Sequence, residues 1–115
     1  MSAIPFRIEA AAAPGDRQFE YEPHGDGRVR LTVRAGERRT GGYRIAVTAI
    51  ARSGPVLTVT REIHEPVPGA LVTQSLTSPA QTVSVDESLV RGVRHVVLVD
   101  GTGAELARIT TQHLT

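Results

Sequence analysis

The stretch Arg28-Val29-Arg30-Leu31-Thr32-Val33-Arg34 decides the fold class, because apolar and polar residues alternate strictly along it. An extended strand points successive side chains to opposite faces, so Val29, Leu31 and Val33 share one face. The opposite face carries Arg28, Arg30, Thr32 and Arg34. This pattern is typical of a strand in an antiparallel sheet, with one face packed on a core and the other in water.

The same alternation appears on both sides of a turn at Ser53-Gly54-Pro55. The run before the turn, residues 43–50, places four side chains on one expected core face: Tyr43, Ile45, Val47 and Ala49. The run after it, residues 56–63, places three there: Leu57, Val59 and Ile63. Two such runs joined by a glycine-proline turn predict a β-hairpin.

Shorter runs fill the rest of the chain, at residues 5–9, 18–22, 81–85, 93–99 and 105–110. The segment from Val96 to Val99 is apolar on both faces, as expected of a central strand. Asp86 is a candidate N-cap for one helical turn. About seven to eight short strands predict an all-β domain, either a small antiparallel sandwich or a partly open barrel, that spans residues 1–115 as one unit.

The composition argues against several classes of protein. The chain has no cysteine, which removes a disulfide framework, a thiol nucleophile and a zinc-thiolate site. Its basic residues are nearly balanced by acidic ones, with a net charge of +1, so we do not expect nucleic acid as a partner. No apolar run approaches the roughly 18 residues of a membrane helix, so membrane insertion is not expected.

The N-terminal residues lack the basic segment and the apolar run of a signal peptide. The chain as given is therefore expected in the cytoplasm. A location in the cell envelope, or outside the cell, is the alternative if the chain is a fragment that lacks its export signal.

No catalytic constellation is evident either. The four histidines have no partner at a recognisable spacing, and no Gly-x-Ser-x-Gly nucleophile motif occurs. The glycine-rich segment 36–42 leads into a β-run and not into a helix, which disfavours a phosphate site. We therefore expect a protein that is not an enzyme, with no catalytic residue, no metal site and no cofactor.

Two segments differ from ordinary turns. Residues 36–43 contain Gly41-Gly42 directly before Tyr43, and glycine permits a positive φ and a close backbone approach. Residues 65–79 form a long segment whose prolines favour an extended chain, and it carries apolar side chains such as Leu71 and Val72. A long loop in a small domain is often functional, although these side chains can equally pack back on the sandwich.

The order of motifs in these segments resembles the C-terminal domain of the PrcB protease-complex subunits. The pattern consists of a glycine, the tetrapeptide Thr40-Gly41-Gly42-Tyr43, a hairpin, Pro66-x-Pro68-Gly69, Thr73-Gln74 and then Pro79 before a strand. The resemblance covers about half of the chain, roughly residues 36–85. It implies a non-catalytic protein partner that associates with a protease and helps to stabilise it.

A second resemblance, to the chagasin-type inhibitors of cysteine proteases, rests on residues 40–43 alone. That family has an immunoglobulin-like fold and an Asn-Pro-x-Thr-Gly-aromatic loop. Here a second glycine is inserted and the Asn-Pro is absent. This resemblance implies a protease inhibitor as an alternative function.

A single-stranded nucleic-acid-binding β-barrel is the other alternative function, since six arginines lie close together between residues 28 and 44.

We interpret the two segments as one protein-binding surface, with Tyr43, Leu71 and Val72 as apolar anchors and Arg38 and Arg39 as charges at the rim. The full set of expected partner-binding residues is Arg38, Arg39, Thr40, Gly41, Gly42, Tyr43, Pro68, Gly69, Leu71, Val72, Thr73 and Gln74. The expected partner is a protein, with a protease as the specific expectation. Homo-oligomers through exposed strand edges are a further expectation.

Overall fold

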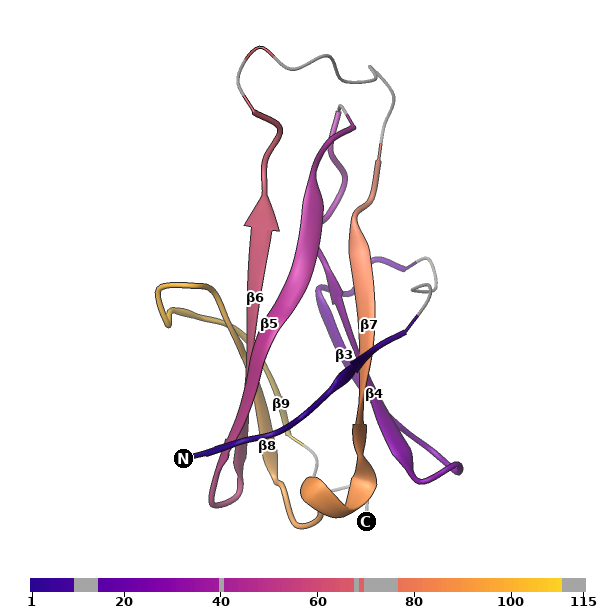
Figure 1. Ribbon diagram of the computed structural model, residues 1–115, viewed down its shortest axis with the longest axis vertical. Helices are drawn as coiled ribbons and strands as arrows, with labels where there is room; N and C mark the ends of the chain where they lie inside the picture. Colours follow the sequence, from indigo (N-terminus) through magenta and orange to yellow (C-terminus); the bar gives the residue numbers. More distant parts are fainter. Residues whose placement is uncertain (10–14, 40, 68, 70–76, 111–115) are drawn as a thin grey trace.

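The computed structural model describes residues 1–9, 15–39, 41–67, 69 and 77–110. They form two facing sheets, and Figure 1 shows them edge-on as an open sandwich. The first sheet has the spatial order β1 (Ser2–Ala3), β5 (Arg44–Ser53), β6 (Val56–His64), β8 (His95–Val99) and β9 (Glu105–Thr110). The second has the order β2 (Arg7–Ile8), β7 (Ala80–Asp86), β4 (Arg28–Arg34) and β3 (Phe19–His24). A single 3-10 turn, η1 (Glu87–Leu89), follows β7.

The prediction of an all-β sandwich is confirmed, and the barrel alternative is not the observed form, because the two sheets remain separate. The described residues contain nine strands. The additional strand relative to the prediction is β1, which is only two residues long. No helix in the described part of the chain has the length and apolar character needed to cross a membrane.

The core lies between the sheets and is built almost entirely from valine, leucine and isoleucine. Strand β4 follows the predicted alternation, with Val29, Leu31 and Val33 buried. The opposite sheet contributes Leu57 and Val59 from β6, both fully buried. Strand β8 lies between β6 and β9, and its residues 96–99 are buried, as the apolar run predicts for a central strand.

The prediction that Ala49 faces the core is wrong. The register of β5 against β6 shifts between Val47 and Ala49, which marks a β-bulge. An extra residue in one strand reverses the alternation beyond it, so Ile50 is buried instead and Ala49 is exposed. The hairpin itself is confirmed, since Ser53 pairs with Val56 across the turn.

Strand direction also departs from the expectation in one place. The named strand pairs are antiparallel, except that β6 and β8 run parallel. Between these two strands the chain crosses to the second sheet, forms β7 and turns through η1. Alternation of side chains does not depend on the direction of the neighbouring strand, so the pattern could not show this.

Three aspartates organise turns of the sandwich. Asp86 is the N-cap of η1, as predicted, and accepts a hydrogen bond from the backbone N–H of Ser88 at 2.9 Å. Asp100 accepts from the N–H of Thr102 at 2.9 Å, and Asp26 from the N–H of Arg28 at 3.1 Å. Each accepted bond stabilises the ionised carboxylate.

The pKa of each aspartate is therefore below the ordinary value. The side-chain hydrogen bond from Arg30 is the main cause for Asp26, that from Ser88 for Asp86 and that from Thr102 for Asp100. A carboxylate whose pKa is lowered in the folded state stabilises the fold at pH values above the unfolded-state pKa. This contribution is lost as the pH falls below that value and through the folded-state pKa.

We accordingly expect the melting temperature to fall on acidification, beginning as the pH approaches about 4. The triple variant Asp26→Asn, Asp86→Asn, Asp100→Asn should show a smaller acid-induced drop than the wild type, since an amide does not titrate. Thermal denaturation followed by circular dichroism from about pH 7 to about pH 2 measures both curves. Parallel curves would show that these turns do not contribute to acid sensitivity.

Candidate partner-binding surface

The two segments singled out in the sequence are joined backbone to backbone. The N–H of Arg38 donates to the carbonyl of Thr77 at 2.7 Å, and the N–H of Thr77 donates to the carbonyl of Arg38 at 2.8 Å. Nearer the sandwich, the N–H of Ala35 donates to the carbonyl of Pro79 at 2.9 Å. The bridge therefore continues the β4–β7 ladder beyond the ends of both strands.

We call this end of the molecule the joined loop surface. Its described members are residues 36–39, 41–43 and 77–79. In Figure 1 it lies at the top, where β5 begins and β7 starts, at the opposite end from η1. Two segments that are far apart in sequence thus present one face.

Arg38 and Tyr43 form a contact within this surface. The guanidinium carbon of Arg38 lies 5.2 Å from the centre of the Tyr43 ring, within the range of a cation–π interaction. One guanidinium nitrogen of Arg38 also donates to the carbonyl of Ala35 at 3.1 Å. Arg38 is consequently half-buried and held against the surface, whereas the neighbouring Arg39 is exposed.

Tyr43 itself is half-buried and precedes the first residue of β5. Gly42, immediately before it, is exposed and has a φ of 89°, the left-handed conformation that glycine adopts without a steric penalty. The partly exposed ring of Tyr43 leaves room for contact with another molecule. A fully buried ring would have had a structural role only.

Half of the expected binding residues lie outside the described part of the chain: Thr40, Pro68, Leu71, Val72, Thr73 and Gln74. Of the others, Gly69 is exposed with a φ of 84°, and it lies in the second segment away from the bridge. Among the expected residues, the structure therefore shows Arg38 in contact with Tyr43, and Arg39, Gly41 and Gly42 lie in the chain between these two. Their role in binding stays a prediction.

A hollow of about 480 Å³ lies beside the joined loop surface. Its lining combines the chain before β3 with the ends of both joined segments, and its residues are Gly15, Asp16, Gln18, Arg34, Ala35, Gly36, Glu37 and Ser78. The Arg34 guanidinium is fixed in this lining, since it donates to Glu20 Oε2 at 2.7 Å and to the carbonyl of Arg17 at 3.1 Å. The residue pattern did not indicate this hollow, because its lining is scattered along the chain.

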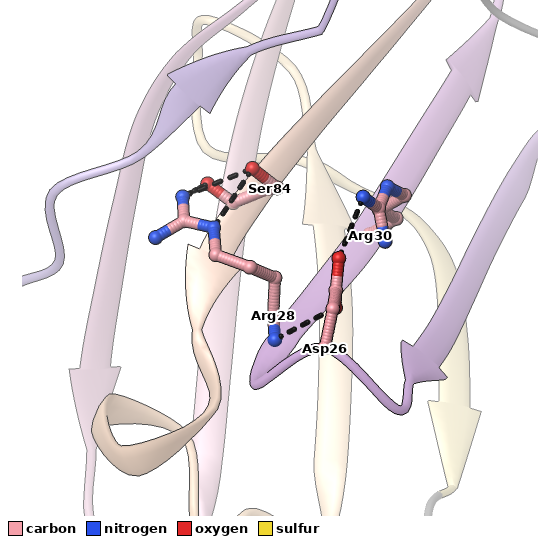
Figure 2. Close-up of polar contacts among 4 residues, drawn as sticks. All are labelled: Asp26, Arg28, Arg30 and Ser84. Carbon is pink, nitrogen blue, oxygen red and sulfur yellow. Dashed lines mark hydrogen bonds and ion pairs between the residues drawn. The ribbon is translucent and has the colours of Figure 1, made fainter.

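The arginines of β4 lie on the outer face of the second sheet, where they bind neighbouring strands and turns. The guanidinium of Arg28 donates to Ser84 Oγ at 2.9 Å and 3.2 Å and to the Ser84 carbonyl at 2.9 Å, as Figure 2 shows. Arg30 donates to Asp26 Oδ2 at 2.9 Å. Ser84 is fully buried, so Arg28 supplies the partner that a buried hydroxyl needs.

Two features important for the architecture were not evident from the sequence. Gln81 of β7 accepts a hydrogen bond from the backbone N–H of Val47 through its Oε1 at 2.8 Å, and so links the second sheet to the edge of the first. Ser84 lies opposite Arg30, on the outer face of the second sheet, where the sequence pattern predicts an exposed side chain, but it is fully buried. Both are polar residues in a segment whose other residues favour a strand, and nothing in the sequence of this segment indicates that either makes a specific contact.

Among the histidines and acidic residues that the structure describes, no group of three is arranged to hold a metal ion. His64 is exposed at the end of β6, and His95 is partly buried at the start of β8. His113 lies beyond the described residues.

Residues 31–86 of the chain match the family model described as PrcB C-terminal. The matched range begins within β4 and ends at the last residue of β7, so it contains the β5–β6 hairpin and the whole joined loop surface. A search of the curated proteins and a search of the solved structures found no match.

Proposed function

On the match of residues 31–86 to the PrcB C-terminal family model, we propose that the chain is a non-catalytic protein-binding module, a subunit that binds and stabilises a protease. The family suggests a subunit related to a protease complex. The joined loop surface is the part of this domain that we assign to the partner.

The observation that carries this assignment is the backbone bridge between Arg38 and Thr77. It fixes two segments into one surface, within the range that the family model covers. A preorganised surface binds with a smaller loss of conformational entropy than two independent loops. Tyr43 supplies a half-buried aromatic side chain, the type that contributes most at protein interfaces, and Arg39 supplies an exposed charge on the same loop.

The polar network on the outer face of the second sheet favours a protein partner over a nucleic acid. Phosphate binding requires arginines that are free to reach the backbone of the nucleic acid. Arg28 and Arg30 are instead engaged with Ser84 and Asp26, and the side chain of Arg34 is only 9% exposed. No specific observation favours the inhibitor alternative.

The experiment is affinity capture from native lysate of the source cells, followed by reconstitution of the purified pair. Three baits are compared: the wild type, Arg39→Glu and Arg91→Glu. Both replaced arginines are exposed, but Arg91 follows η1 at the far end of the sandwich and serves as the matched control. We expect a protease to be enriched by the wild type and by Arg91→Glu, and to be reduced with Arg39→Glu.

Reconstitution then tests for the stabilising role, since a protease stabilised by the subunit should melt at a higher temperature in the complex. The proposal is rejected if no protease binds directly to the wild type. Equal binding by all three baits would remove the joined loop surface as the binding site.

A further inference from the structure

The outer edge of β5 is divided into an occupied half and an open half. The N-terminal segment covers the lower half, where Ser2 pairs with Arg52 and Ala3 with Ala51. The N–H of Ile4 then donates to the carbonyl of Ile50 at 2.8 Å. Beyond this point the segment leaves the first sheet and joins the second as β2, a crossing visible in Figure 1.

Above the crossing, no strand among the described residues pairs with the outer edge of β5 from Arg44 to Ala49. The hydrogen bond from Val47 to Gln81 shows that the N–H of Val47 points away from β6. Residues two apart on a strand direct their backbone groups to the same side, so the N–H and carbonyl of Ile45 point outward as well. The open half thus presents a short row of outward-facing donors and acceptors.

Gln81 occupies one position in this row. It lies opposite Val33 in the β4–β7 ladder, a position that faces the core side of the second sheet, and its amide oxygen reaches the edge of the first. That oxygen accepts from Val47 as the carbonyl of a neighbouring strand would. The edge therefore already binds an amide carbonyl that comes from outside its own sheet.

The other long edges carry features that discourage strand pairing. The edge strand β3 contains Pro23 and two glutamates, and β9 has an exposed ion pair in which Arg108 and Glu105 are 2.9 Å apart. Residues 45–49 of β5 contain neither proline nor a charged side chain. The bulge between Val47 and Ala49 limits the regular part of this edge to about four residues.

We propose that an extended segment of the protein partner pairs with the open half of β5, between Arg44 and Ala49, as an added strand. An extended polypeptide is the ligand whose backbone matches a row of alternating N–H and carbonyl groups. The N-terminal segment demonstrates this mode on the lower half of the same edge. The site adjoins the joined loop surface through Tyr43, and in assigning the segment to the partner the inference rests on the proposed function.

The test uses a defined peptide and no protease. The probe is acetyl-Lys-Thr-Val-Thr-Val-Lys-amide, and its control is the same peptide with an N-methyl group on every backbone amide, which removes the donors of both edges. Both are titrated into the ¹⁵N-labelled full chain and followed by amide chemical shifts. We expect the unmethylated probe to shift the amides of residues 44–49 and the side-chain amide of Gln81, and the methylated probe to shift neither.

A matched pair of variants locates the site. Thr48→Lys and Thr110→Lys add the same charge at exposed threonines on the two edges of the first sheet. We expect Thr48→Lys to weaken binding of the probe about fivefold and Thr110→Lys to leave it unchanged. Amide dispersion in each spectrum reports whether the variant is folded, and the comparison of the two peptides on the wild type does not depend on either variant.

The inference is overturned if the methylated peptide produces the same shifts, if the shifts fall on β9, or if the two variants bind the probe equally. These results are separable from those of the capture experiment. Peptide binding without capture of a protease would leave the strand site in place and remove the proposed function. Capture of a protease without peptide binding would support the proposed function and remove the strand site.

Discussion

Tyr43→Ala is expected to weaken binding of the partner protease by at least about tenfold, the largest single effect on the joined loop surface. The ring is half-buried, stacks on the Arg38 guanidinium and lies where the surface meets β5. Truncation removes both the contact area of the ring and the support that holds Arg38 in place. Arg39→Ala, at an exposed position, should change the affinity by about threefold or less.

Isothermal titration with the purified protease measures these differences, and Tyr43→Phe is the control. Phenylalanine keeps the ring over Arg38 and should retain most of the affinity. Because Tyr43 is only half-buried, the alanine variant should remain folded, which thermal denaturation verifies. If Arg39→Ala costs more affinity than Tyr43→Ala, the anchor of this surface has been misassigned.

Leu57→Ala is expected to lower the free energy of unfolding by about 2–5 kcal/mol, the largest single effect on stability. Leu57 is fully buried in β6, which lies between β5 and β8 in the first sheet. The core contains few aromatic rings and depends on close packing of small branched side chains. A cavity at its centre therefore removes contacts on several sides.

Leu89→Ala is the matched control, since the same side chain in η1 is 37% exposed. Its cost should be about 0.5–1 kcal/mol, because less apolar surface leaves the protein interior. Urea denaturation of both variants gives the comparison. Equal destabilisation would mean that the centre of the sandwich relaxes to fill the cavity, or that η1 is packed more tightly than its exposure indicates.

The strands that could be predicted closely are those whose pattern is local. Strand β4 has the predicted bounds because its alternation is uninterrupted, and β9 also begins and ends where the sequence indicated. The N-cap role of Asp86 was readable for the same reason, since a cap depends on neighbours two or three residues away.

What could not be predicted depends on contacts between distant segments. The alternation of β5 fails after Val47 because a bulge adds a residue, and no residue type marks that position. The contact of Gln81 with Val47 requires two strands from different sheets. In the candidate site, the glycines before Tyr43 indicated a special loop, but the bridge to Thr77 exists only because β4 and β7 are neighbours.

The parallel pairing of β6 with β8 has a consequence for how the chain acquires its fold. The β5–β6 and β8–β9 hairpins are local and can form within microseconds, whereas β6 and β8 are separated in the chain by the segment that forms β7 in the other sheet. Folding is slow when it depends on such non-local pairing. During synthesis on the ribosome, the β5–β6 hairpin emerges before β8, so the edge of β6 that pairs with β8 lacks this partner until β8 follows. An unpaired strand edge of this kind favours aggregation of the nascent chain.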